Sequence, residues 1–259
     1  MQSQNAISLL SFPQAVIGTA SPGIASLPLG HAAGAILCLG NFDGFHRGHH
    51  SVIATARAIA AQLEVPAAIM SCEPHPRSYF AAENHKPFRL FSPRQKRTYF
   101  PELGMGYLYE PRFDASFANL EAEDFLESVL LRGLQVGGLV CGADFRFGSK
   151  RRGDPEMLQR FCARHGLTYA VLAKVLPASS TGIRNALLDG EPESATEQLG
   201  RPWKIDLYAG QTQLRPAPGR YLVRDTETGE THLLRVAANG DLAIEGFAHL
   251  REAEILTRL

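Results

Sequence analysis

The chain has 259 residues, of which 45% are hydrophobic and 20% are charged, and its 26 basic side chains balance its 26 acidic ones. A net charge of zero argues against a protein that coats nucleic acid or anionic lipid, because such proteins carry a basic excess. No apolar run approaches the roughly 18 residues that a membrane-spanning helix needs, and residues 1–42 lack the positive start of a secretory signal. The four cysteines form no CxxC pair, so we expect reduced thiols and a cytoplasmic protein.

Short apolar runs alternate with helical patterns from residue 35 to residue 173. Strand, helix and strand in repeated order favour right-handed crossovers, and therefore an α/β fold with a parallel sheet and helices on both faces. Ligands of such sheets bind at the carboxyl ends of the strands. The predicted strands are 35–40, 67–72, 105–109, 138–141 and 168–173, and the predicted helices are 51–63, 92–103, 121–132 and 154–165.

The pattern changes after Gly200-Arg-Pro202, where short alternating runs are separated by turn signals such as Asn239-Gly240. We therefore predict a main domain over residues 1–202 and a small C-terminal unit over residues 203–259. This unit should be an antiparallel β structure that closes with a helical tail from about Ala248. It is too short to bury much surface alone, so Trp203 should anchor it to the main domain. Removal of residues 203–259 should lower the stability of the protein but not its activity.

The segment Gly40–His50, GNFDGFHRGHH, joins a predicted strand to a predicted helix. Backbone N–H groups and the helix dipole favour an anion there, and glycines allow a ligand to approach closely. The spacing fits neither GxGxxG nor GK[ST]. His46 and His49 could donate hydrogen bonds to phosphoryl oxygens and stabilise the charge that develops in phosphoryl or nucleotidyl transfer. Two alternatives stay open: a glycine-rich turn with surface histidines, and a zinc site that adds His50.

A second segment of this kind, Ala178–Arg184, follows the last predicted strand and opens a helix. Ser179, Ser180 or Thr181 could simply cap that helix. Arg184 comes one turn later and would face an anion at the same helix start. Together with the first loop, the pair of segments could grip the two ends of a triphosphate.

Two further loops carry unusual side chains. In Cys72–Arg77, prolines on either side of His75 fix the backbone. In Gly142–Gly148, two phenylalanines alternate with polar residues; they could form a wall for a flat ring system or serve as ordinary core anchors. The basic runs 94–97 and 150–152 are typical of solvated surfaces.

Taken together, these motifs resemble the FMN adenylyltransferase module of the bacterial bifunctional riboflavin kinase/FAD synthetases, within the HxGH nucleotidylyltransferase superfamily. HxGH alone marks the superfamily, whereas the PHP and GADFRFG motifs indicate a flavin substrate. The resemblance covers roughly residues 35–203. The matching motifs are GNFDGFHRGHH (40–50), EPHPRSYF (73–80), FANLEAEDFLESVL (117–130), GADFRFGSKRRGD (142–154), SSTGIRNALLDGE (179–191) and LGRPW (199–203).

The resemblance implies a Rossmann-like domain that uses ATP, FMN and Mg²⁺ and releases FAD, with Mg²⁺ carried on the ATP phosphates and no metal site on the protein. It implies small-molecule partners, neither nucleic acid nor membrane, and leaves the oligomeric state open. By motif, the catalytic residues would be His46, His49 and Arg184. The ATP-binding residues would be Gly40, Asn41, Phe42, Asp43, Gly44, His46, His49, Ser180, Thr181 and Arg184, and the FMN-binding residues Pro74, His75, Pro76, Asp144, Phe145, Arg146, Phe147 and Gly148.

The chain departs from the family pattern in two places. Gly182 stands where the family commonly has a basic residue, and residues 203–259 carry no GRTLGFPTAN-like signature of a riboflavin kinase barrel. We therefore expect an FAD synthetase that transfers AMP from ATP to FMN and has no riboflavin kinase activity. The alternatives are an idle flavin- or nucleotide-binding paralogue, and adenylyl transfer to another phosphorylated metabolite.

Overall fold

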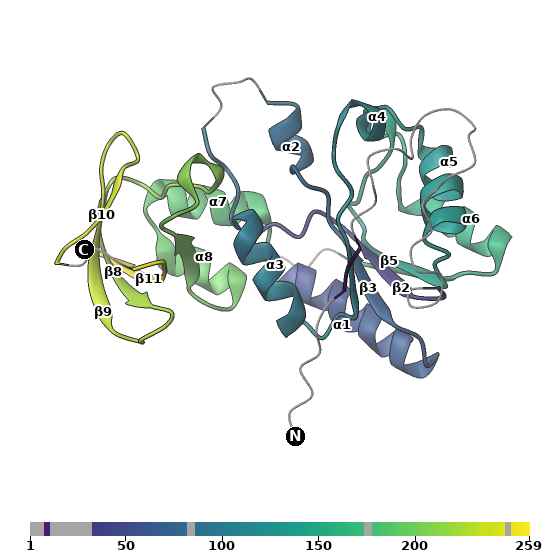
Figure 1. Ribbon diagram of the computed structural model, residues 1–259, viewed down its shortest axis with the longest axis horizontal. Helices are drawn as coiled ribbons and strands as arrows, with labels where there is room; N and C mark the ends of the chain where they lie inside the picture. Colours follow the sequence, from purple (N-terminus) through teal and green to yellow (C-terminus); the bar gives the residue numbers. More distant parts are fainter. Residues whose placement is uncertain (1–7, 11–32, 82–85, 174–177, 247–249) are drawn as a thin grey trace. The chain divides into compact units, whose positions relative to one another are not determined.

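The computed structural model describes residues 8–10, 33–81, 86–173, 178–246 and 250–259 (Figure 1). Within these ranges, no helix is both long and apolar enough to cross a membrane. The chain divides into two compact units. The first comprises Met1–Phe42, His49–Ala82 and Thr98–Lys174, and the second Asp43–Gly48, Glu83–Arg97 and Val175–Leu259.

The first unit is built on a parallel sheet, which confirms the predicted α/β fold. Its strand order is β1-β4-β3-β2-β5-β6, and every pairing between neighbours is parallel. All five predicted strands are present, and the edge strand β1 was not predicted. The strands are β1 (Ser8–Leu10), β2 (Ile36–Leu39), β3 (Ala67–Met70), β4 (Tyr107–Tyr109), β5 (Gly138–Gly142) and β6 (Thr168–Leu172).

The predicted helices are also present, with shifted ends. The segment predicted at 121–132 starts as an α-helix and continues as a π-helix, in which the N–H of Leu134 bonds to the carbonyl of Val129. Two helices cross the division between units: α1 and α3 each begin in the second unit. The helical elements are α1 (Arg47–Gln62), α2 (Pro76–Tyr79), α3 (Pro93–Glu102), α4 (Ala115–Ala118), α5 (Ala122–Asp124), the π-helix η1 (Phe125–Gly133), the 3₁₀ turn η2 (Ser149–Arg151) and α6 (Pro155–His165).

Helices cover both faces of this sheet. Since alternate residues of a strand point to opposite faces, neighbouring residues of β2 contact different helices. On one face, Leu37 and Leu39 of β2 pack in a core with η1 and α6, to which Leu130 and Phe161 contribute. On the other face, the Cys38 thiol lies 3.8 Å from the Val52 carbonyl of α1. The crossover helices therefore leave the carboxyl ends of the strands to the loops.

The second unit contains an antiparallel sheet of order β10-β9-β8-β11-β7, whose strands β8 to β11 are drawn yellow-green to yellow in Figure 1. Its apolar face shares one core with two helices, through side chains such as Leu187, Trp203 and Tyr221. Residues 203–259 thus bury their apolar face against the helices that precede them in sequence. The elements are α7 (Ser180–Asp189), α8 (Pro192–Leu199), β7 (Trp203–Asp206), the 3₁₀ turn η3 (Gly210–Thr212), β8 (Gly219–Asp225), β9 (Thr231–Val236), β10 (Leu242–Ile244) and β11 (Glu252–Arg258).

The prediction of a helical tail is wrong for the part of it that the structure describes. Glu252–Arg258 is strand β11, which pairs with both β7 and β8. Ala253 and Ile255 are fully buried and alternate with charged residues, as period two requires of a half-buried strand. The predicted start of the tail, at Ala248, lies outside the described residues.

All four cysteines are free and buried. Burial raises the pKa of the Cys38 thiol, and it raises the pKa of Cys141 and of Cys162 to about 11. These side chains therefore stay protonated near neutral pH and serve the core as small apolar groups.

Candidate functional site

The first part of the glycine-rich loop, Gly40–Phe42, follows β2 in the first unit. Phe42 adopts a left-handed φ of 47° and is 1% exposed. A Cβ on Gly40 would lie 3.0 Å from Phe42 Cε2, so glycine allows the ring to fold back over the chain. The same ring lies 5.2 Å from the imidazole of His49, centroid to centroid, and the Asn41 carbonyl accepts a hydrogen bond from Ser71 Oγ at 3.0 Å.

The next residues, Asp43–Gly48, belong to the second unit, where the Asp43 carboxylate is 3% exposed. Its Oδ1 accepts the backbone N–H groups of Leu90 (2.9 Å) and Phe91 (3.1 Å). Its Oδ2 forms an ion pair of 2.5 Å with Nη2 of Arg184. Both carboxylate oxygens are thus engaged by the protein, so this side chain holds the loop in place.

His46 precedes α1 and is 9% exposed. Its Nδ1 accepts the N–H of Gly48 at 3.1 Å, which satisfies one of the unpaired donors at the helix start. A neutral imidazole that accepts at Nδ1 carries its proton on Nε2. The local fold therefore prepares Nε2 of His46 as a hydrogen-bond donor.

Gly44 is required by both conformation and space. Its φ is +91°, and a Cβ there would lie 2.7 Å from Leu90 Cδ1. Arg201, from the LGRPW motif, donates to the Gly44 carbonyl at 3.0 Å and lies over the Phe91 ring at 5.1 Å. The close approach of Leu90 and the hydrogen bond from Arg201 thus fix the conformation of the loop.

We expect Gly44→Ala to lower the free energy of unfolding by more than about 2 kcal/mol. The cost of a left-handed φ in alanine adds to the cost of the clash between the new Cβ and Leu90. The matched control is Gly229→Ala, where φ is +76° but nothing lies within 4 Å of the added Cβ. That control should cost about 1 kcal/mol. Urea unfolding of both variants measures the difference, and equal costs would contradict the tight packing of Gly44 on Leu90.

The structure shows which of the three hydroxyl residues at the start of α7 caps the helix. Ser179 is the N-cap, and its Oγ accepts the N–H of Gly182 at 3.0 Å. The Ser180 hydroxyl is therefore not the cap; it donates to the Asp43 carbonyl at 2.8 Å and ties α7 to the glycine-rich loop. Thr181 is exposed on the first turn. At Gly182, a Cβ would lie 2.5 Å from Gln198 Oε1, so the Gln198 side chain occupies the space beside this glycine.

Arg184 is buried one turn into α7 and is 9% exposed. Besides its ion pair with Asp43, its Nε donates to the Phe88 carbonyl at 2.8 Å and its guanidinium lies over the Phe88 ring at 5.3 Å. A guanidinium has five N–H donors, so donors remain for a ligand.

The predicted flavin segments both lie in the first unit. His75 is 8% exposed and caps α2, with Nδ1 accepting the N–H of Arg77 at 3.0 Å. Phe145 and Phe147 stack at 5.7 Å with an interplanar angle of 19°. Gly148 has a φ of +70°, and a Cβ there would lie 2.7 Å from Ala122 Cα. Pro74, Asp144 and Arg146 are exposed and Pro76 is half-buried.

A continuous series of aromatic contacts joins these two segments. Its centroid distances run from 5.1 Å between Tyr79 and Phe80 to 6.1 Å between Phe117 and Phe125. Phe80 is 70% exposed at one end of the series. The series runs through Phe80, Tyr79, Phe113, Phe117, Phe125, Phe147 and Phe145.

The structure thus joins some of the predicted residues by direct contact, within each unit separately. In the second unit, the predicted residues Asp43, Ser180 and Arg184 are in direct contact. In the first unit, Phe42 contacts His49, and the His75 and Phe145 segments are linked by aromatic rings. Sequence reasoning did not single out Phe80, Phe113 and Arg201, which contact the predicted residues or their neighbours. Phe80 and Arg201 lie in quoted motifs, EPHPRSYF and LGRPW.

Two curated bacterial proteins align with most of this chain. The bifunctional riboflavin kinase/FMN adenylyltransferase of Escherichia coli K12 is 36% identical over 187 residues, which cover 71% of this chain and 59% of that protein. The protein of the same name from Listeria monocytogenes is 30% identical over 222 residues, covering 76% of this chain and 70% of the relative. The chain therefore spans about 59% of the length of its Escherichia coli relative.

A solved structure titled as a macrolide-efflux protein from Streptococcus pneumoniae has a TM-score of 0.72 and 22% identity, over 89% of this chain and 87% of that one. This likeness concerns the fold alone. The model of the FAD synthetase family matches residues 30–183, which include the glycine-rich loop, both predicted flavin segments and the start of α7. Because that match covers more than half of the sequence, the chain belongs to the FAD synthetase family.

Proposed function

We propose that this protein is an FMN adenylyltransferase, which transfers AMP from ATP to FMN. A phosphate oxygen of FMN attacks the α-phosphorus of ATP, the bond from that phosphorus to the bridging oxygen of the β-phosphate breaks, and pyrophosphate leaves. The product is FAD. The protein needs to position the two phosphates and stabilise charge, and no side chain has to act as a nucleophile.

The observation that carries this proposal is the junction of the glycine-rich loop with the start of α7. The Asp43 carbonyl accepts from Ser180 Oγ, and the Asp43 carboxylate pairs with Arg184. One compact unit thus presents a helix N-terminus, a guanidinium and the Nε2 donor of His46, which are the groups that bind phosphoryl oxygens. We assign them to the triphosphate, and His49 of the first unit to the same reaction.

Magnesium would enter with ATP, bound to the phosphate oxygens. Asp43 is an acidic residue of the loop, but Leu90, Phe91 and Arg184 already engage both of its oxygens. We therefore assign no metal to Asp43. Carried by the ATP phosphates, Mg²⁺ would supply charge neutralisation for the pyrophosphate.

We assign the flavin to the aromatic side of the first unit. Phe80 is an exposed ring at the end of the aromatic series, and Phe145 is a half-buried ring at the other end. Flat heteroaromatic rings stack on such side chains, and each stacked pair contributes about 0.5–1.5 kcal/mol beyond the area it buries.

Accordingly, Phe80→Ala should raise the KM for FMN about tenfold, which corresponds to roughly 1.4 kcal/mol of lost binding. The KM for ATP should stay within about twofold, and the free energy of unfolding within about 0.5 kcal/mol because the ring is exposed. Leu63→Ala removes another exposed apolar side chain of the first unit, 50% exposed, and serves as the control. An unchanged KM for FMN in Phe80→Ala would remove this ring from the flavin site.

The decisive test of the function is incubation of the purified protein with ATP, Mg²⁺ and FMN, followed by chromatography for FAD and pyrophosphate. FAD formation supports the proposal. Flavin and nucleotide binding without FAD would instead indicate a catalytically idle binder, and AMP transfer only to another phosphorylated compound would indicate a different acceptor.

We also propose that residues 203–259 provide no riboflavin kinase site and that the protein works in the cytoplasm, where its substrate ATP is found. The proposal on the kinase rests on the absence of a GRTLGFPTAN-like signature from these residues. Supplying riboflavin in place of FMN tests it: no FMN should appear.

A further inference from the structure

One short segment of the second unit, Phe88–Gln95, contacts two other parts of that unit. On one side it contacts Asp43 and Arg184 of the candidate phosphate site, and on the other it contacts the C-terminal sheet. We call it the linking segment. On the side of the site, the N–H groups of Leu90 and Phe91 donate to Asp43 Oδ1. The Phe88 carbonyl accepts from Arg184 Nε at 2.8 Å. Both partners of the Asp43–Arg184 ion pair therefore depend on this segment for their place.

The opposite edge of the linking segment is held by the strand β7 and the loop that follows it. The Leu90 carbonyl accepts from Trp203 Nε1 at 2.8 Å and from Gln213 Nε2 at 2.9 Å. The Arg89 carbonyl accepts from the N–H of Leu214 at 2.8 Å. The peptide groups of Leu90 thus bond to Asp43 through the N–H and to the C-terminal residues through the C=O.

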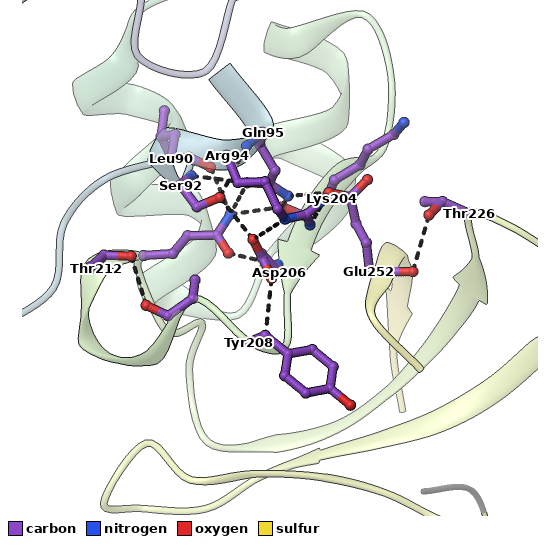
Figure 2. A network of polar contacts seen from close by, with 12 residues as sticks. Leu90, Ser92, Arg94, Gln95, Lys204, Asp206, Tyr208, Thr212, Thr226 and Glu252 are labelled. Atoms are coloured by element: carbon purple, nitrogen blue, oxygen red, sulfur yellow. Dashed lines mark hydrogen bonds and ion pairs between the residues drawn. The ribbon is translucent and has the colours of Figure 1, made fainter. Parts of the chain in front are cut away.

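Charged groups continue this attachment, as Figure 2 shows for Ser92, Arg94 and Gln95 around Asp206 and Glu252. Asp206 Oδ2 accepts from Ser92 Oγ at 2.8 Å and from Arg94 Nε at 2.9 Å. Glu252 Oε2 accepts from Gln95 Nε2 at 2.9 Å and from Arg94 Nη2 at 3.1 Å.

Burial by itself would raise the pKa of the Asp206 carboxyl, but hydrogen bonds from Arg94, Ser92 and the Tyr208 N–H outweigh it and lower that pKa. The carboxylate therefore stays ionised near neutral pH. Burial by itself would lower the pKa of Arg94, but its hydrogen bonds and ion pairs with Asp206 and Glu252 outweigh that effect and raise it. Both charges of this attachment persist in the conditions under which the protein works.

We propose that residues 203–259 are a positioning element for the binding of a nucleoside triphosphate, and that Gln213 acts through Leu90 and Asp43 to hold Arg184. The inference rests on the proposed function, because it takes Arg184 as a ligand of the ATP phosphates. It predicts the opposite of the sequence-based expectation that removal of residues 203–259 would leave the activity intact.

Gln213 is the residue best suited to this role. It is fully buried, and its Oε1 accepts the N–H of Asp206 at 2.7 Å. Its Nε2 lies 2.9 Å from three oxygens, those of Leu90 C=O, Lys204 C=O and Gln95 Oε1. One amide thereby joins the linking segment, α3 and β7. A shift of the Leu90 peptide would move the Asp43 carboxylate, because Asp43 Oδ1 accepts a hydrogen bond from the Leu90 N–H.

The test compares Gln213→Met with Tyr221→Phe in the full chain. Gln213→Met keeps the volume and removes the amide. Tyr221→Phe removes a buried hydroxyl of β8, whose hydrogen bond goes to the Ala217 carbonyl and not to the linking segment. Binding of the magnesium complex of α,β-methylene-ATP is measured by calorimetry, amide exchange at Leu90 and Phe91 by NMR, and both KM values by FAD formation.

For Gln213→Met we expect the Kd for the ATP analogue to rise about five- to tenfold, with faster amide exchange at Leu90 and Phe91 and a KM for FMN within about twofold of the wild type. Tyr221→Phe should leave all three unchanged. An unaltered Kd in folded Gln213→Met, or an equal rise in Tyr221→Phe, overturns the inference. If Gln213→Met does not fold, Glu252→Gln should show a smaller rise in the same Kd, and no rise overturns the inference.

Failure of the proposed function has a different signature. A wild-type protein that binds the analogue and makes no FAD, while Gln213→Met still weakens binding, would refute the adenylyl transfer and leave the positioning role in place. A wild-type protein that does not bind the analogue overturns both.

Discussion

Replacement of His46 by alanine is expected to lower the turnover number for FAD formation by about 10²–10³-fold, the usual effect of removing one donor to transition-state charge. The Nδ1 atom accepts the N–H of Gly48, so Nε2 carries the proton in the neutral ring. The imidazole is 9% exposed and held by this bond, and a donor fixed before the reaction needs no reorganisation when charge develops. We expect a similar loss in turnover for His49→Ala.

Alanine at position 46 also removes an acceptor for the N–H of Gly48, which costs about 0.5–2 kcal/mol of stability. His46→Asn separates the two effects, since an Asn side chain can accept from the helix start but places no N–H at the position of Nε2. We expect Asn to restore the stability and not the turnover. His50→Ala is the control at the same helix start and should stay within about threefold of the wild type. A turnover number that His46→Asn leaves unchanged would remove His46 from the reaction.

The parts of the fold that the sequence predicted correctly are those that local pattern determines. The aliphatic runs of β2, β3 and β5 are buried on both faces and read as strands without any knowledge of their partners. Helix α6 has both of its end signals, Asp154 at the N-cap and Gly166 at the C-cap with a φ of 65°. By contrast, α1 begins at Arg47, four residues before the predicted start, because its first turn is polar and carries no apolar periodicity.

Strand β11 shows where a short local pattern leaves the choice between helix and strand open. The sequence EAEILTR has alternating charged and apolar residues, yet its identity as a strand depends on pairing with β7 and β8, whose residues lie about 30 to 50 positions earlier in the chain. The edge strand β1 similarly depends on its parallel pairing with β4.

In the candidate site too, local motifs could be predicted from the sequence, whereas contacts between distant residues could not. Glycine and histidine spacing was enough to select the loop at Gly40–His50 and the start of α7. The role of Asp43 could not be predicted, since its partner Arg184 is 141 positions away and its other partners are backbone N–H groups. The motif match places Asp43 among the ligands of ATP, which stays a prediction. The structure adds that its carboxylate contacts Arg184 and the N–H groups of Leu90 and Phe91.

Replacement of Arg184 by alanine is expected to have two effects, because this residue belongs both to the core and to the candidate ATP site. Its removal leaves the Asp43 carboxylate buried without its guanidinium partner, and breaking a buried pair in this way costs about 3–5 kcal/mol. It also removes the planar donor that forks onto phosphate oxygens, so the Kd for ATP should rise at least about tenfold. The loss should be large here because Gly182 supplies no second cation on the first turn of α7.

Two further variants distinguish these effects. Arg184→Lys keeps a charge opposite Asp43 and loses the bond to the Phe88 carbonyl, so we expect a smaller loss of stability and nearly the full loss of ATP affinity. The double variant Asp43→Asn, Arg184→Met removes both charges and should recover part of the stability, since no buried charge is left unpaired. ATP affinity should not recover with it. Chemical unfolding and calorimetric titration with an ATP analogue measure the two quantities separately, and a double variant that regains both would show that Arg184 acts on ATP only by stabilising the fold.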